Sequence, residues 1–145
     1  MSSCIRVRVT GTIEFDMVPK RAFDLFTPNG ERAWAHDWRP EFPNGETGDV
    51  EVGLVFETCH TDRRSIWTVV RCEPGKAIAY STTTPGHRAG TVAVTCQLVG
   101  GGTTVTVSYD ITALRPEEND DLKKFETHFP EFLGEWELSI ARAMR

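Results

Sequence analysis

Two tryptophans mark the part of the sequence whose residue types most suggest binding chemistry. Trp34 and Trp38 lie in a stretch from Thr27 to Pro43 that begins with a Pro-Asn-Gly turn and ends with two prolines. Residues four apart share one face of a helix, so the two indoles are expected side by side. They would form either a packed corner at one end of a sheet or the entrance of a cavity that grips an apolar or aromatic ligand, with the indole N–H groups as polar handles.

Between these tryptophans, His36 and Asp37 form a pair of the kind that binds metal ions. A metal site needs further ligands at close approach, and the other histidines come from separate segments, namely His60, His87 and His128. The cysteines are equally scattered, without a Cys-x-x-Cys pair; they are Cys4, Cys59, Cys72 and Cys96. We therefore predict neither a metal site nor a cofactor, and we expect buried, reduced thiols.

Three histidines are placed by their sequence context. His60 ends a run in which alternate positions are apolar, so its ring either points inward near a strand end or lies at the rim. His128 flanks Phe125 and Phe132, and the pattern does not decide between a cavity-facing and an exposed ring. His87 lies at a predicted hairpin tip, Thr-Pro-Gly-His, and is expected to be solvated.

Tyr80 and Tyr109 share the strand parity of neighbouring apolar residues, so both rings are predicted to point into the covered face of a sheet. Because a buried phenol needs a hydrogen-bond partner, each hydroxyl would bind either another protein group or a ligand carbonyl. Trp67 and Trp136 are predicted core residues, with pocket lining as the alternative role. Three carboxylates are expected to be solvated or to cap helices, namely Asp24, Glu31 and Asp110.

Charge and missing motifs argue against several classes of protein. A formal net charge of -5 without a basic stripe opposes binding to nucleic acid. No run approaches the roughly 18 apolar residues of a membrane span and no apolar signal segment begins the chain, so we expect a cytoplasmic protein without membrane insertion. The sequence contains no G-x-S-x-G motif, so it offers no support for covalent catalysis. An enzyme would instead position its substrate in a dry cavity and offer a histidine or tyrosine as proton donor or acceptor.

The positions of these residues depend on the strands and helices that the sequence predicts. Strict alternation predicts a first strand from Ile5 to Asp16, and two short helices follow, from Pro19 to about Phe26 and from about Gly30 to Trp38. Five β-rich runs separated by tight turns then predict antiparallel hairpins, over residues 49–61, 65–72, 76–84, 89–98 and 103–112. At 145 residues, a single domain spanning 1–145 is the simplest arrangement.

The C-terminal region is predicted to be helical. Its apolar residues recur at three- and four-residue steps, as Leu122, Phe125, Phe129, Phe132, Trp136, Ile140 and Met144. Because a proline costs about 3 kcal/mol inside a helix but little in its first turn, Pro130 places the main helix at about Thr127 to Met144, with Thr127 as N-cap. The alternative is one continuous helix that is kinked at Pro130.

This order of elements resembles the helix-grip fold of the START-like or SRPBCC superfamily, which includes the birch-pollen-allergen-like proteins and the small polyketide cyclases. The stretches VPKRAFDLFTPNGERAWAHDW, GLVFET and SIWTVV look like the small bacterial members, and the resemblance spans nearly the whole chain. It implies an α+β fold: a curved antiparallel sheet of about six to seven strands wraps around the long C-terminal helix. A cavity between them would open near the two short helices.

The resemblance implies three alternative functions, because its motifs specify architecture rather than chemistry. The protein would bind a hydrophobic or amphipathic small molecule, as in lipid transport, or it would act on polyketide-like substrates as a cyclase, aromatase or dehydratase. A third alternative is an interaction module similar to the activator of Hsp90 ATPase domain, for which the sequence shows no exposed apolar stripe. A homodimer is possible. The candidate cavity-lining residues are Trp34, Trp38, Phe56, His60, Trp67, Tyr80, Tyr109, His128, Phe132 and Trp136.

Overall fold

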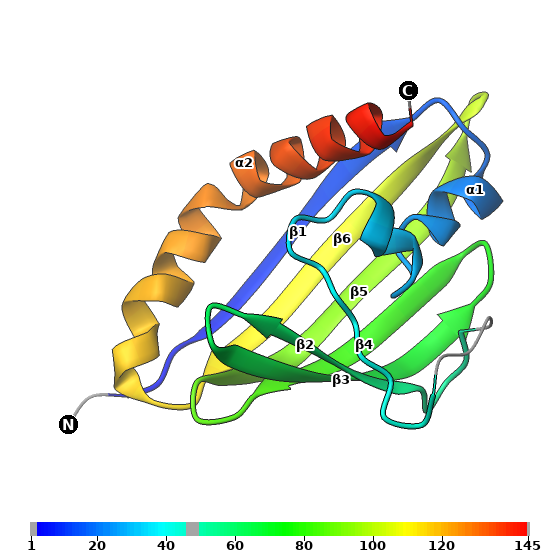
Figure 1. Ribbon diagram of the computed structural model, residues 1–145. Helices are drawn as coiled ribbons and strands as arrows, with labels where there is room; N and C mark the ends of the chain where they lie inside the picture. Colours follow the sequence, from blue (N-terminus) through cyan, green and yellow to red (C-terminus); the bar gives the residue numbers. More distant parts are fainter. Residues whose placement is uncertain (1–2, 46–49, 145) are drawn as a thin grey trace.

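A computed structural model describes residues 3–45 and 50–144, and one antiparallel β-sheet forms its centre (Figure 1). The six strands lie in the order β1-β6-β5-β4-β3-β2, so consecutive hairpins build most of the sheet and the first strand pairs with the last. Their bounds are β1 (Arg6–Phe15), β2 (Val55–His60), β3 (Arg63–Glu73), β4 (Ala77–Thr84), β5 (Arg88–Val99) and β6 (Gly102–Ala113).

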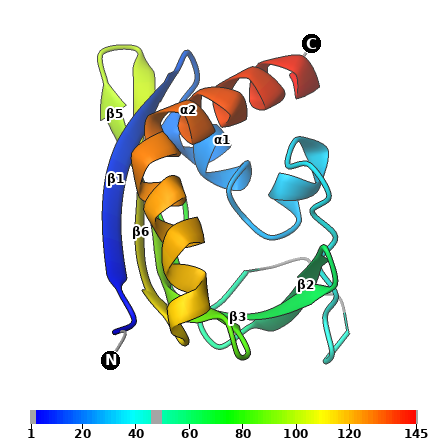
Figure 2. The same cartoon turned by 90° about the vertical axis from the view of Figure 1, so that its left-hand side faces the viewer.

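Two short helical segments follow β1, and a long helix ends the chain. The short segments are α1 (Pro19–Asp24) and the 3₁₀ turn η1 (Gly30–Ala33). A second 3₁₀ turn, η2 (Pro116–Glu118), leads into α2 (Asn119–Ala143). Figure 2 shows β2 and β3 curling away from β1 toward the side on which α1 and α2 lie. The predicted helix-grip α+β fold is therefore confirmed.

The pairing of β1 with β6 follows from the alternation in the sequence. The inward side chains Val7 and Ile13 are buried, whereas Arg6 lies on the outer face and pairs with Asp110 of β6 at 2.6 Å. At Gly11, an added Cβ would lie 2.5 Å from Cδ1 of Leu133 on α2. The missing side chain therefore lets α2 pack closely against β1.

The turns explain why consecutive strands can be antiparallel. His60 pairs with Arg63, so only Thr61 and Asp62 connect β2 to β3, and their φ angles are 46° and 65°. Two consecutive residues with positive φ are what a type I′ hairpin turn requires, and the twist of this turn matches that of the strands. Gly100, with a φ of 61°, supplies the same conformation between β5 and β6.

β2 is shorter than the predicted strand over residues 49–61. Asp49 lies outside the described residues, and the backbone N–H of Leu54 donates to the carbonyl of Glu51, which closes a turn ahead of the strand. Val52 is exposed in this turn, so the inward-facing alternation begins only at Phe56. In the sequence, apolar residues alternate through this segment as well, but its backbone forms a turn and not a strand.

Three side-chain donors hold the segment between α1 and η1. The indole Nε1 of Trp34 donates to the carbonyl of Leu25 at 2.8 Å, and that of Trp38 donates to the carbonyl of Pro28 at 2.8 Å. The hydroxyl of Tyr80 on β4 donates to the backbone carbonyl of Phe26 at 2.9 Å. These bonds satisfy backbone carbonyls of the irregular segment that follows α1 and fix its conformation.

The second predicted helix, from about Gly30 to Trp38, is wrong in its length. Only the single 3₁₀ turn η1 forms, and the chain then leaves the helical conformation, with Asp37 at a φ of 57°. The indole bonds described above replace helical hydrogen bonds as the constraint on this segment. Tertiary contacts therefore override the local helical pattern.

The predicted start of the C-terminal helix is also wrong, and the continuous alternative holds. α2 begins at Asn119 and contains Pro130 in its interior. Thr127 is not an N-cap, because its hydroxyl donates to the carbonyl of Lys123 one turn earlier at 3.0 Å. Figures 1 and 2 show that α2 changes direction along its length. A proline explains such a bend, since it lacks the N–H of one helical hydrogen bond and its ring clashes with the preceding turn.

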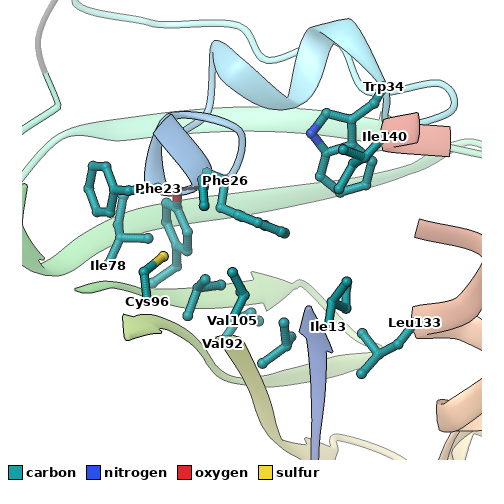
Figure 3. Close-up of a cluster of buried hydrophobic side chains, with 14 of the residues drawn as sticks. Ile13, Phe23, Phe26, Trp34, Ile78, Val92, Cys96, Val105, Leu133 and Ile140 are labelled. Atoms are coloured by element: carbon teal, nitrogen blue, oxygen red, sulfur yellow. Dashed lines mark hydrogen bonds between the residues drawn. The ribbon is translucent and has the colours of Figure 1, made fainter. Parts of the chain in front are cut away.

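The main core lies between the sheet, α1 and the C-terminal half of α2. Figure 3 shows Phe26 and Trp34 above the strand residues Val92 and Val105. Fully or nearly fully buried side chains dominate this cluster, including Ile13, Phe23, Ile78, Cys96, Leu133 and Ile140. The side chains at this end of the sheet are tightly packed, whereas a cavity lies next to this cluster.

Candidate functional site

An inner chamber of about 240 Å³ lies beside the core. Strands β3 to β6, the segment around η1, and α2 form its walls, and it is lined by Phe26, Glu31, Ala35, Trp38, Trp67, Tyr80, Val92, Val94, Tyr109, Phe132 and Trp136. None of these lining residues is classed as exposed, so the chamber is enclosed mainly by aromatic and aliphatic side chains. Such surroundings favour an apolar guest over water.

A wider outer pocket of about 600 Å³ adjoins this chamber. The two share Trp67, Val92 and Tyr109 as lining residues, so they lie next to each other. The remaining lining residues of the outer pocket are mostly polar, namely His60, Thr61, Arg63, Ser65, Thr82, Thr84, Arg88 and Asp121, with Ile111 and Phe125. The exposed residues among them come from the β2–β3 turn and the start of α2, so the wide opening faces that end rather than the short helices, where the entrance was expected.

Among the described residues, three of the six polar side chains of the chamber wall already have protein partners. Besides the bonds that Trp38 and Tyr80 donate to backbone carbonyls, the Nε1 of Trp67 donates to Oγ1 of Thr58 at 2.9 Å. These hydrogen bonds fix the orientation of the rings. The three side chains therefore contribute apolar surface to the chamber, while their donors serve the structure.

Three polar side chains of the chamber wall differ. Within residues 3–45 and 50–144, no hydrogen bond or ion pair engages the carboxyl of Glu31, the hydroxyl of Tyr109 or the indole N–H of Trp136. Tyr109 packs edge-on against the rings of Phe125 and Phe129 from α2, with centroid distances of 5.1 and 5.8 Å. The ring of Tyr109 is thus fixed by packing, and its hydroxyl stays available at the junction of the two pockets.

Glu31 has unusual electrostatics. Burial raises its pKa well above the ordinary value of 4.5. The two phenols also have raised pKa values, mainly through burial and further through the charge of Glu31; for Tyr80, Cys72 contributes as well. Because an ionised Glu31 acts on both tyrosines, the carboxyl and the phenols belong to one enclosed environment. There, burial favours the uncharged form of the carboxyl, which can donate as well as accept a hydrogen bond.

Behind the outer pocket, two of its lining arginines hold a second carboxyl in a different environment. Glu118 in η2 is almost fully buried, and its Oε1 accepts hydrogen bonds from Arg63 at 2.9 Å and from Arg88 at 3.1 Å. His87 Nδ1 lies 3.3 Å from Oε2 of the same carboxylate. Burial alone would raise the pKa of Glu118, but the bonds from Arg88, Arg63 and His87 outweigh it and lower the pKa to about 2. The prediction of a solvated His87 is therefore wrong.

The structure separates the predicted candidates into three groups. Trp38, Trp67, Tyr80, Tyr109, Phe132 and Trp136 line the inner chamber. His60 lies exposed at the rim of the outer pocket. Trp34 and Phe56 are buried in the core and line neither pocket, and His128 is exposed on α2, where its Nδ1 lies 3.1 Å from Glu131.

Glu31 is the functional candidate that the sequence analysis missed. A charged residue next to a Pro-Asn-Gly turn is normally solvated, and Glu31 was predicted accordingly. The sequence did contain a usable signal, because Glu31, Ala35 and Trp38 are spaced as i, i+4 and i+7 and all three line the chamber. Only the folded arrangement distinguishes this pattern from a solvated surface residue.

The other titratable groups do not form a site. In the described part of the chain, no three His, Cys, Asp or Glu side chains are placed to hold a metal ion. His36 lies 3.3 Å from Asp37 at the surface. All four cysteines are free, but Cys4 and Cys59 are exposed, contrary to the expectation of buried thiols. Among the described helices, none is long and apolar enough to cross a membrane.

Some apolar side chains are exposed near β2 and β3. The sequence indicated no exposed apolar stripe, and the exposed valine and isoleucine side chains in this region are Val52, Val55, Ile66 and Val70. Val55 and Ile66 have the strand parity opposite to that of the inward-facing Phe56 and Trp67. They lie on the outer face of the sheet, away from both pockets.

Comparisons with known proteins agree with this architecture. A curved antiparallel sheet that grips a C-terminal helix defines the helix-grip class of START-like proteins. The model of the family described as polyketide cyclase / dehydrase and lipid transport matches residues 6–133, so the chain belongs to this family. The resemblance to the SRPBCC superfamily is thereby confirmed. No curated protein matches the sequence.

Several solved structures share the fold at low sequence identity. The Mll3558 protein from Rhizobium loti is 20% identical, with a TM-score of 0.71 over 94% of this chain and 99% of that one. An uncharacterised protein from Rhizobium leguminosarum is 15% identical, with a TM-score of 0.70 over 98% and 99%. The Aha1 dimer from Colwellia psychrerythraea is 17% identical, with a TM-score of 0.59 over 88% and 90%. At these identities the likeness shows the fold alone.

Proposed function

We propose that the protein binds a hydrophobic or amphipathic small molecule, with the apolar part of the ligand in the inner chamber. The observation that carries this proposal is an enclosed chamber whose lining is aromatic and aliphatic and whose ring donors are mostly bonded to the protein. A family that includes lipid transport proteins supports the same function.

The two adjoining pockets suit an amphipathic guest. Binding sites for small molecules typically have volumes of roughly 300–1,000 Å³ and few polar groups. The chamber of about 240 Å³ would accept a compact ring system, and the polar outer pocket of about 600 Å³ would accept the remainder of a longer molecule. Tyr109 and Trp67 line both spaces, so such a ligand would pass along their rings.

The proposal is tested first by native mass spectrometry of the freshly isolated protein, which would reveal a small molecule that accompanies it. A direct test is thermal unfolding with added naphthalene, since a ligand that binds only the folded state stabilises it by about 2.7 kcal/mol at a hundredfold excess over Kd. The variant Ala35→Phe places a ring into the chamber and is expected to abolish this stabilisation.

The matched control is Ala33→Phe, because Ala33 is an exposed residue of η1 that does not line the chamber. It should fold and bind naphthalene like the unmodified protein. If neither naphthalene nor larger two-ring probes stabilise the protein, or if Ala35→Phe binds them equally well, the chamber is not the binding site.

Catalysis in the same chamber is the second candidate, and the Glu31 carboxyl and the Tyr109 hydroxyl favour it. Two polar groups facing one apolar space could exchange protons with a substrate carbonyl during cyclisation or dehydration. A histidine was expected as one possible proton donor or acceptor, but His60 lies exposed at the rim. The test is mass-spectrometric detection of water loss from 4-hydroxy-4-(2-naphthyl)butan-2-one, a β-hydroxy ketone, which Glu31→Gln should abolish while binding persists.

A further inference from the structure

We propose that Glu31 determines specificity by presenting an uncharged carboxyl in the wall of the chamber, so that the bound molecule directs a neutral oxygen, a ketone or a hydroxyl, toward the polar groups of Glu31 and Tyr109. This inference rests on the proposed binding function and adds the chemistry of the group that enters first. It predicts discrimination against ligands whose buried end is a carboxylate or an amine.

The first step of the argument is the supply of hydrogen bonds. In the described residues that line the chamber, the polar side-chain groups left without partners are those of Glu31, Tyr109 and Trp136. A neutral carboxyl and a phenol each donate one hydrogen bond and accept others, whereas an indole only donates. A ligand oxygen has two lone pairs, so two of these three donors are enough to satisfy it.

The second step is the charge of the chamber. Burying a charged group is costly unless an opposite charge pairs with it. Among the residues that the structure describes, no arginine, lysine or histidine lines the chamber, so a ligand carboxylate would find no counter-ion from them. Arg63 and Arg88 line only the outer pocket, where both already pair with Glu118. The buried end of the ligand is therefore uncharged.

A ligand that places an amine in the chamber is the alternative that the experiment must exclude. Aromatic rings and a carboxylate together attract organic cations, and an ammonium group would draw Glu31 into its ionised form. The two possibilities differ in the sign of their pH dependence. A neutral oxygen needs protonated Glu31, so its binding weakens as the carboxyl ionises with rising pH, whereas ammonium binding strengthens as it ionises.

The neighbouring titratable groups leave this readout interpretable. Glu31 shares the chamber with the phenols of Tyr80 and Tyr109, and burial raises the pKa of both, so they stay protonated while Glu31 titrates. Cys72, whose pKa burial also raises, acts on Tyr80. The charged and titratable groups of the outer pocket are His60, Arg63, Arg88 and Asp121, with Glu118 behind the arginines. A variant at Glu31 separates its titration from theirs.

The experiment measures the Kd values of four probes with the same ring system: naphthalene, 2-acetylnaphthalene, 2-naphthoate and 2-naphthylmethylamine. It uses the full chain and the variants Glu31→Gln and Glu31→Leu, with Glu135→Gln on the exposed face of α2 as the matched control. Binding is followed by calorimetry from about pH 5 to about pH 9, a range that spans the pKa values of buried carboxyls. Urea unfolding of each variant verifies that it is folded.

The ratio of ketone to naphthalene affinity is the decisive quantity. In the unmodified protein the ketone should gain about tenfold relative to Glu31→Leu, the size expected of one hydrogen bond. Glu31→Gln, which still donates, should keep most of this gain and lose the weakening at high pH. Naphthoate and the amine should bind more weakly than the ketone, and Glu135→Gln should change nothing.

The outcomes separate the inference from the proposed function. If all four probes fail to bind, the binding function itself is contradicted. If naphthalene binds but the ketone shows no advantage that depends on Glu31, the chamber binds ligands without Glu31 and the inference is overturned. Amine binding that strengthens with rising pH and disappears in Glu31→Gln would likewise overturn it, in favour of a cation site.

Discussion

At the scale of single residues, two carboxyls with little exposure to solvent behave in opposite ways. Glu31 has no partner among the described residues and its pKa is raised by burial, whereas Glu118 is surrounded by Arg63, Arg88 and His87 and its pKa is lowered to about 2. The difference lies in whether cationic donors compensate the loss of hydration. One carboxyl is suited to ligand recognition, and the other joins η2 to the ends of β3 and β5.

Glu118 should therefore stabilise the fold as an anion. Its pKa is lowered in the folded state from the ordinary 4.5, so its stabilisation is complete above pH 4.5 and is lost as the pH falls toward about 2. Glu118→Gln should lower the free energy of unfolding at neutral pH by about 2 kcal/mol, since it leaves two partly exposed guanidinium groups without their buried charged partner. Urea unfolding at several pH values measures this difference.

The control for this variant is its exposed neighbour, Glu117→Gln, which should change stability by less than about 0.5 kcal/mol. The deficit of Glu118→Gln relative to the unmodified protein should shrink as the pH is lowered through the stated window. An equal deficit at pH 7 and below pH 3 would show that the ion pairs contribute nothing.

At the scale of elements, α2 combines two tasks. Its residues near Leu133 and Ile140 pack into the core, while Phe132 and Trp136 line the chamber. Pro130 lies between the first half of the helix, which borders the outer pocket through Asp121 and Phe125, and this second half (residues 131–143). The bend thus falls where the helix passes from one pocket to the other.

Replacement of this proline tests the role of the bend. Pro130→Ala restores one backbone donor at an exposed position and should raise the free energy of unfolding by about 1 to 3 kcal/mol, because proline is the poorest helix former. Thermal or urea unfolding measures the change, with Glu135→Ala as the control on the exposed face. A loss of stability would instead mean that the bend is needed to pack Phe132 and Trp136.

At the scale of the whole molecule, the charges are distributed as neutralised pairs. Several arginines form ion pairs with nearby carboxylates. The pairs are Arg6 and Arg8 with Asp110, Arg64 with Glu41 and Glu57, and Arg115 with Glu117. Several of the described arginines are therefore not free to form a basic surface, and the formal net charge is -5. A field of this sign repels phosphate backbones.

We accordingly expect no binding to double-stranded DNA at about 0.1 M salt, where screening leaves only close charges effective. Fluorescence anisotropy of a labelled duplex measures this, with a basic DNA-binding protein as positive control. Binding that weakens steeply with added salt would contradict the charge argument. The single domain over residues 1–145 and the possible homodimer stay predictions, and sedimentation of the full chain tests the second.

The sequence by itself determined the order of elements and the faces of the strands. Alternation in β1 and the short turns between β2 and β6 depend on local chemistry, namely side-chain parity and residues that tolerate positive φ. The chamber aromatics on β3, β4 and β6 could be predicted for the same reason, since parity alone turns them inward. Local patterns overextended β2 and misplaced the start of α2, because neither the turn near Val52 nor the tolerance of Pro130 is encoded locally.

Only the tertiary structure decided which inward-facing side chains border empty space and which are packed. Trp34 and Trp38 are equivalent in sequence, yet one is core and the other lines the chamber, because the segment is fixed by bonds from separate elements. Glu31 became a candidate only when α2 and the four strands β3 to β6 enclosed it. Burial and pKa are properties of the surroundings, and the surroundings of Glu31 come from residues more than forty positions away along the chain, such as Tyr80, Tyr109 and Trp136.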